Sequence, residues 1–409
     1  MMAPAAVRPG QARVVGAVMA CHFVAAFAAL GMPPFFSLIL SRSLHSDAAW
    51  LAGWLYIVPT FFTALSSPWW GRLADRYGKK RLLLRAQFGL AASFALAGVA
   101  QDTATFALAL VLQGLLGGTF SASNAYLATV VQGPALMRSL TWMQWSARAA
   151  LFAAPAALGV ALPLVAAPLA LYRWLALLPL AAALCIWWMP EFGNPQAGAR
   201  AAGAVAAQAA PSAPAASARQ LYALQWLFVF ATVLTFPYCV PWLHEAAGAS
   251  VAQASLLFGL PHLVYLACAI PLTRWLGRAR LLATLGAAFA LLAVALPAQA
   301  WSAAHGWPAL AAWRVAMGLG MTAAYLALHG LIAAMVNGGN AGRTFGWFES
   351  SSKWGAVAAG LGAGVLVQAA GMRAPFIAGG VAMLAAACFT AWIASSQFHM
   401  NNRSRHAND

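Results

Sequence analysis

The sequence predicts an all-α membrane protein with twelve transmembrane helices in two six-helix bundles and both termini in the cytoplasm. Hydrophobic residues make up 63% of the 409 residues, and charged residues only 7%. Apolar runs of about twenty residues, long enough to cross a bilayer core as a helix, recur along the whole chain. A segment rich in Ala, Pro, Gly and Ser separates six of these runs from the other six.

The apolar runs give approximate bounds for each span. The first run follows Arg8 and Arg13 and continues to Leu40, which is too long for the hydrophobic core of a cleaved signal peptide. We therefore interpret it as the first span. The expected spans are 14–40, 50–70, 82–100, 104–131, 140–164, 168–189, 220–243, 250–273, 281–300, 307–336, 344–369 and 374–395.

This layout divides the chain into four parts. Residues 1–189 form the first bundle and residues 220–395 the second, with a polar cytoplasmic tail at 396–409. Residues 190–219 have little apolar surface to bury and are expected to form a flexible cytoplasmic linker. A weak repeat relates the bundles, with Gly114 opposite Gly318. Parallel duplication of this kind predicts a binding site where the two halves meet.

The basic residues indicate the orientation of the chain. With a cytoplasmic N-terminus, only Arg42, Arg173 and Arg373 fall outside, so the positive-inside rule supports an even number of spans. The net charge of +16 then reflects topology in a lipid bilayer and requires no nucleic-acid partner. The cytoplasmic set is Arg8, Arg13, the six basic residues from Arg72 to Arg85, Arg138, Arg200, Arg219, Arg274, Arg278, Arg280, Arg343, Arg403 and Arg405.

The sequence contains no recognisable motif of an enzyme active site. The five cysteines lie in apolar runs without metal-ligand spacing, so no metal site is expected. The Gly-Lys-Lys at residues 78–80 lacks the spacing of a nucleotide-binding loop, and neither a zinc-protease motif nor a nucleophile elbow occurs. We therefore expect neither an enzyme nor a cofactor.

The most highly charged stretch, GRLADRYGKKR at residues 71–81, is expected to be the loop between the second and third spans. It resembles the G-x-L-A-D-R-x-G-R-K signature of the major facilitator superfamily, and the resemblance extends over essentially the whole chain. It implies a transporter in which this loop latches the two halves, with the aspartate near the start of the eleventh span at residues 339–345. The latch residues that the resemblance implies are Gly71, Asp75, Arg76, Gly78, Lys79, Lys80 and Arg343.

Within that superfamily the chain resembles the twelve-span, proton-coupled exporters of drugs and metabolites. Two departures are visible: the fifth-span signature of those exporters survives only as APAALG at residues 154–159, and the fourth-span arginine is replaced by Leu110, whereas the tenth span carries Arg314. The chain is also similar to bacterial siderophore exporters of the alcaligin-exporter type. These resemblances imply a multi-pass protein of the bacterial inner membrane, and we expect a monomer.

Four charged residues lie deep inside predicted spans: Arg148, Arg314, Glu349 and Lys353. A charge in a bilayer costs at least about 2.5 kcal/mol, so each needs a partner or a hydrated cavity. Arg148 and Lys353 each follow a loop arginine by ten residues, or about 15 Å of helix. We expect them to face one cavity; the less favoured alternative is a packing ion pair between Glu349 and Lys353 without a ligand role.

These positions give two candidate sets. The expected substrate-binding residues are Arg148, Arg314, Lys353, Gln144, Trp145 and Tyr325. Proton coupling needs a group that changes charge, for which Glu349 ranks first and His262 next, followed by His22 and His329.

The predicted function is export of an organic small molecule by proton antiport with alternating access. Three cations against one carboxylate favour an anionic or metal-chelating, siderophore-like substrate, and a drug is the other candidate. Two alternatives remain open: import of an organic anion by proton symport, and a membrane sensor that does not transport.

Overall fold

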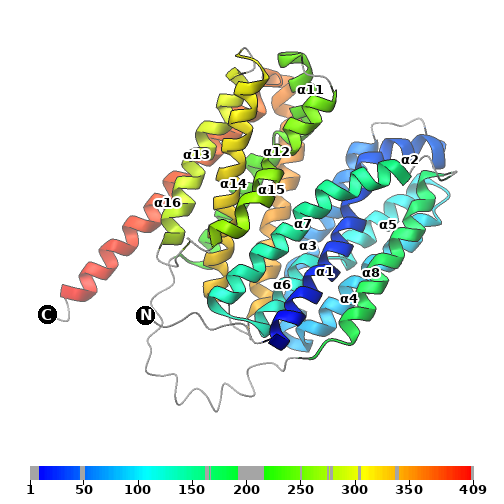
Figure 1. Ribbon diagram of the computed structural model, residues 1–409, viewed down its shortest axis with the longest axis horizontal. Coiled ribbons are helices and arrows are strands. Elements are labelled where there is room, and N and C mark those ends of the chain that lie inside the picture. The colour runs from blue at the N-terminus through cyan, green and yellow to red at the C-terminus, as the bar shows by residue number, and fades with distance from the viewer. Residues whose placement is uncertain are drawn as a thin grey trace. The chain divides into compact units, whose positions relative to one another are not determined.

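The computed structural model of the chain describes residues 9–46, 51–161, 165, 167–191, 216–248, 251–273, 276, 280–302, 305–336 and 340–406. Every regular element in these ranges is a helix (Figure 1). The chain forms two compact units, one made of residues 1–210 and 336–353 and the other of residues 211–335 and 354–409. The predicted linker at 190–219 lies mostly outside the described residues.

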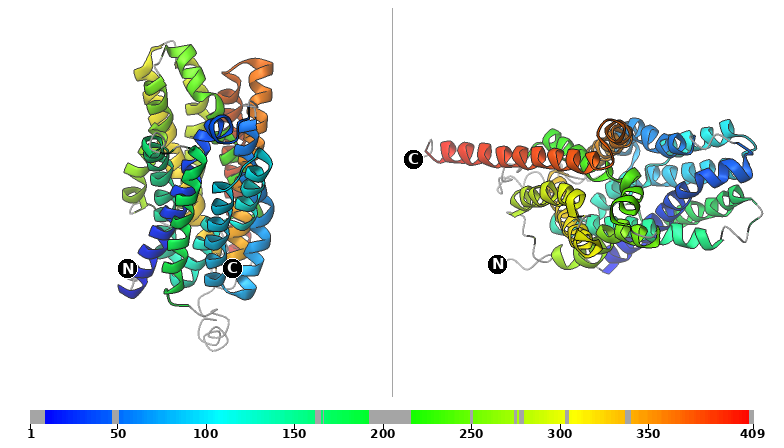
Figure 2. Two further views of the ribbon diagram at one scale, coloured as in Figure 1. Left: turned by 90° about the vertical axis from the view of Figure 1, so that its right-hand side faces the viewer. Right: turned by 90° about the horizontal axis from the view of Figure 1, so that it is seen from above.

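The first unit, which we call unit 1, contains the N-terminal helices and the beginning of α15. Its long helices run side by side, with α1 packed on α7 and α8, and α4 packed on α5 and α8 (Figures 1 and 2). The elements are α1 (Pro9–Gly31), η1 (Pro33–Phe35), α2 (Phe36–Ser43), α3 (Leu51–Tyr77), α4 (Lys79–Gly98), α5 (Thr103–Leu116), α6 (Thr119–Val130), α7 (Gly133–Ala161), η3 (Pro168–Ala170), α8 (Leu171–Trp187) and the first part of α15 (Ala341–Ala370).

The second unit, unit 2, is also helical. Its α13 packs on both α14 and α16, and α12 packs on α14. An aromatic cluster lies within it, where the Tyr325 ring meets Phe228 edge-on at 4.7 Å and Tyr265 at 5.9 Å. The elements are α10 (Ala218–Val233), α11 (Phe236–Ala247), α12 (Val251–Thr273), α13 (Leu281–Ser302), α14 (Trp307–Met335), the remainder of α15 and α16 (Ala374–His406).

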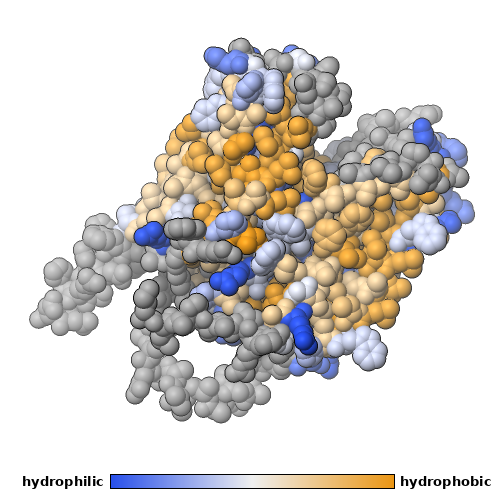
Figure 3. Space-filling model, in the orientation of Figure 1, coloured by the Kyte–Doolittle hydropathy of each residue, from blue (hydrophilic) through white to orange (hydrophobic). Residues whose placement is uncertain are grey.

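Eight stretches of the described chain are long and apolar enough to cross a membrane. Figure 3 shows hydrophobic residues over the middle of the helices in each unit and hydrophilic residues towards the helix ends. The other four predicted spans correspond to α3, α4, α7 and α15, which are 20 to 30 residues long. These four helices carry the polar signature and three of the four deep charges, so their composition is less apolar.

The predicted loop at residues 71–81 is wrong in its conformation. Helix α3 continues to Tyr77 and α4 begins at Lys79, so most of the polar signature is helical. A single residue, Gly78, turns the chain with φ of 104°, a value that only glycine adopts easily. The α3–α4 corner is therefore a one-residue turn between two helices of unit 1.

Three predicted spans are interrupted. The first stops at Gly31 because the following prolines impose a short 3₁₀ turn, and the seventh breaks before Phe236, where Pro237 lacks an N–H donor. The fourth breaks at Gly117 and Gly118, the latter in the left-handed conformation.

The N-terminus of α5 is capped by Asp102. Its carboxylate accepts a 2.7 Å hydrogen bond from the Thr105 N–H, and this bond lowers the pKa of the exposed carboxyl group.

Candidate functional site

The Asp75 carboxylate lies at the N-terminus of α15. It accepts hydrogen bonds from the backbone N–H groups of Gly342 at 2.9 Å and Arg343 at 2.7 Å. Its Oδ1 is also 3.0 Å from the ammonium of Lys79, one turn further along. The first N–H groups of a helix have no partner within the helix and carry partial positive charge, so a carboxylate there both caps the helix and opposes its dipole.

Small residues allow α3 and α15 to approach this closely. A Cβ atom on Gly71 would fall on the carbonyl of Gly342, and one on Gly346 would be 2.6 Å from the carbonyl oxygen of Ser67. Further along the same face, the Ser350 hydroxyl donates to the Ala64 carbonyl at 2.6 Å. The facing sides of α3 and α15 are thus lined by Gly, Ser and Ala. Such small residues let the two helix backbones come into contact.

The other predicted latch residues occupy different environments. The Lys80 ammonium donates to the carbonyls of Trp187 at 2.9 Å and Met189 at 2.6 Å, so it caps the C-terminus of α8. Arg76 is exposed, with its guanidinium 5.4 Å from the Tyr77 ring centre. Arg343 is also exposed and contributes its backbone N–H to Asp75 rather than its side chain.

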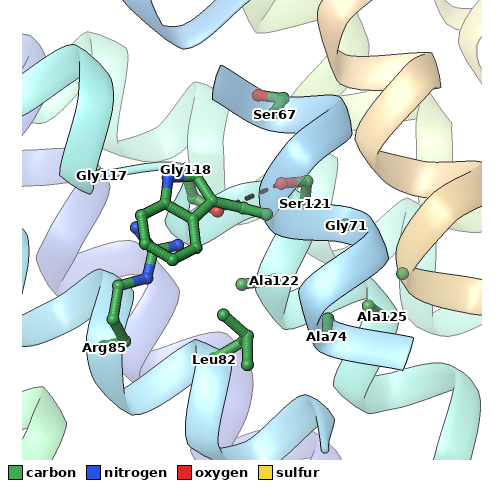
Figure 4. Close-up of a pocket in the computed structure, with 12 residues that line it drawn as sticks. Ser67, Gly71, Ala74, Leu82, Arg85, Gly117, Gly118, Ser121, Ala122 and Ala125 are labelled. Carbon is green, nitrogen blue, oxygen red and sulfur yellow. Dashed lines mark hydrogen bonds between the residues drawn. The ribbon is translucent and has the colours of Figure 1, made fainter. Parts of the chain in front are cut away.

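A small cavity lies beside this crossing, and Arg85 reaches towards it from α4 (Figure 4). The guanidinium donates to the Leu116 carbonyl at 2.6 Å and stacks on Trp70 at 3.6 Å, while the Trp70 indole donates to the Leu115 carbonyl at 2.6 Å. These carbonyls lose their helical partners where α5 stops at the Gly117–Gly118 break. Sequence reasoning assigned Arg85 only to cytoplasmic charge, and the glycine pair was the available signal for a break.

The deep charges of unit 1 form two local pairs. On α15, the Lys353 ammonium is 3.3 Å from a Glu349 carboxylate oxygen, and Glu349 is 8% exposed. On α7, the Arg148 guanidinium donates to the Gln144 side-chain oxygen at 2.7 Å, and both residues are buried. Trp145 lies on the same helix, with its ring 5.8 Å from that of Trp142.

The fourth deep charge, Arg314, lies in unit 2 and binds backbone. Its Nε donates to the Leu257 carbonyl at 2.8 Å and an Nη to the Phe258 carbonyl at 2.6 Å. Its other Nη is 3.2 Å from the side-chain oxygen of Gln299, a residue that the sequence did not single out. Arg314 is only 2% exposed, so these contacts occupy the guanidinium.

The three candidate histidines are all buried. In unit 1 the His22 ring packs against Phe120 at 5.1 Å. In unit 2 the His262 ring meets Phe236 edge-on at 6.1 Å, and the His329 Nδ1 is 2.8 Å from the Tyr325 carbonyl oxygen one turn earlier.

The candidate residues therefore divide between the two units. Unit 1 contains all the latch residues together with Glu349, Lys353, Arg148, Gln144, Trp145 and His22. Unit 2 contains Arg314, Tyr325, His262 and His329. Within the described ranges, no group of three or more His, Cys, Asp or Glu side chains could hold a metal ion.

Comparison with known proteins identifies relatives at the level of fold and family. A family model described as Major Facilitator Superfamily matches residues 18–239 and 221–406. The protein named multidrug resistance protein MdtG is 38% identical over 115 residues in Citrobacter koseri and 37% identical over 115 residues in Salmonella arizonae. Each match covers 28% of this chain and 28% of the relative's length.

Solved structures share the whole fold at low sequence identity. The human organic anion transporter MFSD10 gives a TM-score of 0.77 at 19% identity, covering 94% of this chain and 100% of that one. A bacterial homologue of the iron transporter ferroportin gives 0.72 at 14% identity, with the same coverages. The Escherichia coli fucose:proton symporter FucP gives 0.70 at 14% identity, with coverages of 94% and 99%.

Proposed function

The chain belongs to the Major Facilitator Superfamily, and from that premise we propose that it exports an organic small molecule across a bacterial inner membrane in exchange for protons. It is a multi-pass membrane transporter and not an enzyme. The proposal includes twelve spans, with α3, α4, α7 and α15 joining the eight strongly apolar ones, and cytoplasmic termini. The match to the MdtG proteins supports export and drug efflux.

The proposed coupling to protons rests on the burial of Glu349 and on its single ion-pair contact. Its carboxylate is buried on α15, and within the described chain Lys353 is its only ion-pair partner, at 3.3 Å. Asp75, by contrast, is held by two backbone N–H groups and Lys79. Protonation of Glu349 breaks a single charged contact, so this carboxylate can exchange a proton during the cycle at a smaller structural cost than Asp75.

Protonation of Glu349 would also release Lys353. The Lys353 side chain is 36% exposed, whereas that of Glu349 is 10% exposed, so the ammonium is the more accessible end of the pair. A cation freed in this way favours a substrate with a carboxylate, phenolate or hydroxamate group. We therefore propose competition between the substrate and Glu349 for Lys353, with Arg148, Gln144 and Trp145 as further substrate-binding residues and His262, His22 and His329 as secondary proton sites.

The substrate class remains divided between a drug and a metal-chelating metabolite of the siderophore type. The MdtG relatives favour the drug, and the excess of cations over carboxylates among the deep residues of unit 1 favours an anionic chelator. We propose a molecule that satisfies both: an aromatic or amphipathic compound with at least one acidic group.

The Asp75 contact is proposed as the latch. By capping α15 from the end of α3, it would stabilise one of the two access states of the transporter. Its loss would shift the balance between those states without touching the substrate. Gly71, Arg76, Gly78, Lys79, Lys80 and Arg343 support the same corner in this proposal.

The deciding experiment uses everted membrane vesicles energised to an acidic interior. Three compounds are assayed separately: an anionic and a cationic fluorescent dye of similar size, and a hydroxamate chelator. Uptake of the compound and proton efflux are recorded for each. Export predicts substrate-dependent proton efflux from everted vesicles with preference for the acidic compounds. Glu349→Gln should abolish uphill uptake and proton efflux, whereas Glu191→Gln, at an exposed carboxylate 4.0 Å from Arg81, should not.

Other outcomes would replace the proposal. Uptake only by right-side-out vesicles would establish import by symport. Uphill, proton-coupled uptake by Glu349→Gln would move the coupling group to a histidine. Absence of flux for every compound, in the wild type and in both variants, would favour a sensor.

A further inference from the structure

Helix α12 carries a proline in the middle of its length. Pro261 has no N–H, so the carbonyl of Leu257, four residues earlier, cannot receive its normal helical hydrogen bond. In the hydrocarbon core no water replaces that bond, and an unsatisfied carbonyl is costly. The helix nevertheless continues unbroken from Val251 to Thr273.

Arg314 supplies the missing donor. Its Nε–H is 2.8 Å from the Leu257 oxygen, and an Nη–H is 2.6 Å from the next carbonyl, Phe258. The second Nη is bound to the side-chain oxygen of Gln299 at 3.2 Å and approaches the Met317 sulfur at 3.6 Å. Each nitrogen of the guanidinium is thus used within unit 2.

A glycine on α14 brings the two helices together at this point. Gly318 lies one turn after Arg314, and a Cβ atom there would be 3.0 Å from the Cα of Pro261 and 2.7 Å from the Cβ of Val264. Helices α12 and α14 therefore run side by side in the same direction here. Arg314 lies beside residues 257 and 258, and Gly318, one turn later, lies beside Pro261. The planar fork of an arginine suits two consecutive carbonyls better than a lysine would.

Among the described residues, no carboxylate forms an ion pair with Arg314. The ion pairs in the described ranges join Asp75 to Lys79, Glu191 to Arg81, and Glu349 to Lys353, and Arg314 instead has carbonyl, amide and thioether partners. At 2% exposure it could bind a substrate only by giving up its backbone contacts.

Unit 1 offers a natural contrast. There Gly114 packs on Pro59 as Gly318 packs on Pro261, since a Cβ atom on Gly114 would be 2.5 Å from the Pro59 carbonyl oxygen. The residue four positions before Gly114 is Leu110, a buried hydrophobic side chain without a donor. At this crossing unit 1 has only the hydroxyl donors of Thr63 and Ser66, both bound to the Gly114 carbonyl, so an arginine donor at this position is a feature of unit 2 among the described residues.

We propose that Arg314 is a positioning residue that holds α12 at its proline and is not a ligand of the transported molecule. By replacing the bond that Pro261 removes, it fixes the path of α12 at this point and, with it, the place of His262, the next residue. The inference rests on the proposed transport function and refines it, because it takes Arg314 out of the substrate-binding set that the sequence predicted. Its main test does not depend on transport.

The test is a double-mutant cycle between Arg314 and Pro261, measured as the melting temperature of the purified full-length protein in detergent. Pro261→Ala restores the N–H that pairs with Leu257, so the bond from the Arg314 Nε to that carbonyl becomes dispensable. We expect Arg314→Met to lower the melting temperature strongly in the wild-type background and much less in the Pro261→Ala background. Arg314→Lys keeps the charge but loses the planar fork, so its melting temperature should lie between those of the wild type and Arg314→Met. It provides a milder variant if Arg314→Met does not fold.

Pro59→Ala is the matched control, because it restores an N–H at the equivalent crossing of unit 1. It should leave the cost of Arg314→Met unchanged. Equal costs of Arg314→Met in the wild-type and Pro261→Ala backgrounds would overturn the proposal. In transport assays Pro261→Ala should recover most of the roughly tenfold or greater rate loss caused by Arg314→Met, whereas a substrate ligand would show a raised KM that Pro261→Ala does not correct.

Discussion

Gly71 of α3 and Gly342 of α15 face each other so closely that a Cβ atom on either would fall on the backbone carbonyl of the other. The Asp75 carboxylate can reach the first N–H groups of α15 only because this crossing is so close. Two small residues and one carboxylate thus define the contact, and each can be altered separately.

Gly342→Ala should destabilise unit 1 by about 1–3 kcal/mol, because the added methyl group would overlap Gly71 and also lie 2.9 Å from the Cβ of Ala74. The melting temperature of the purified protein and hydrogen exchange of residues 341–346 measure the effect. Gly16→Ala is the control, since a Cβ atom at Gly16 of α1 meets nothing within 4 Å. Equal melting temperatures for the two variants would contradict the close crossing.

Asp75→Asn should speed hydrogen exchange of the Gly342 and Arg343 amides, because a neutral amide oxygen accepts more weakly than a carboxylate and leaves Lys79 without its charge partner. The same substitution should shift the balance of access states, which can be followed by labelling single cysteines on each side of the membrane. The exposed pair of Glu191 and Arg81 provides the control, and Glu191→Gln should change neither measurement. Unchanged exchange in Asp75→Asn would exclude the capping role.

The sequence predicted the helical fold because long apolar runs leave few alternatives in a bilayer. It could also locate the deep charges, because single charges stand out in apolar segments. The α3–α4 corner was harder, since a run of basic residues is compatible with both a loop and two helix ends. Only the φ of Gly78 distinguishes a one-residue turn from the expected loop.

The partners of the deep charges could not be predicted from spacing in the same way. The Glu349–Lys353 and Gln144–Arg148 contacts follow from neighbours one helical turn apart. The contacts of Arg314 and Arg85 join residues 57 and 31 positions apart and end on backbone carbonyls, which every residue possesses. Only the proline and the glycine pair show in sequence where carbonyls would lack a donor.

Lys353→Met should be more damaging than the double variant Glu349→Gln with Lys353→Met. The single change leaves the buried Glu349 carboxylate without the ammonium 3.3 Å away, whereas the double change removes both charges. Because Lys353 is partly exposed, we expect a cost of about 1–3 kcal/mol for the single variant and less for the double one. Melting temperatures give the comparison, and a double variant as unstable as the single one would show that the pair is not coupled.

Arg85→Met should loosen the junction between α5 and α6. Without the guanidinium, the Leu116 carbonyl loses its 2.6 Å donor and Trp70 loses the cation stacked 3.6 Å from its ring. An unpaired carbonyl in this setting costs about 1–3 kcal/mol, so the melting temperature should fall and exchange of residues 119–122 should rise. Arg85→Lys should recover part of the loss, because it keeps a donor but not the planar group that stacks on Trp70. Arg81→Met removes an exposed arginine one turn earlier and should leave both measurements unchanged. If Arg85→Met and Arg81→Met gave the same melting temperature and the same exchange, Arg85 would not stabilise the junction between α5 and α6.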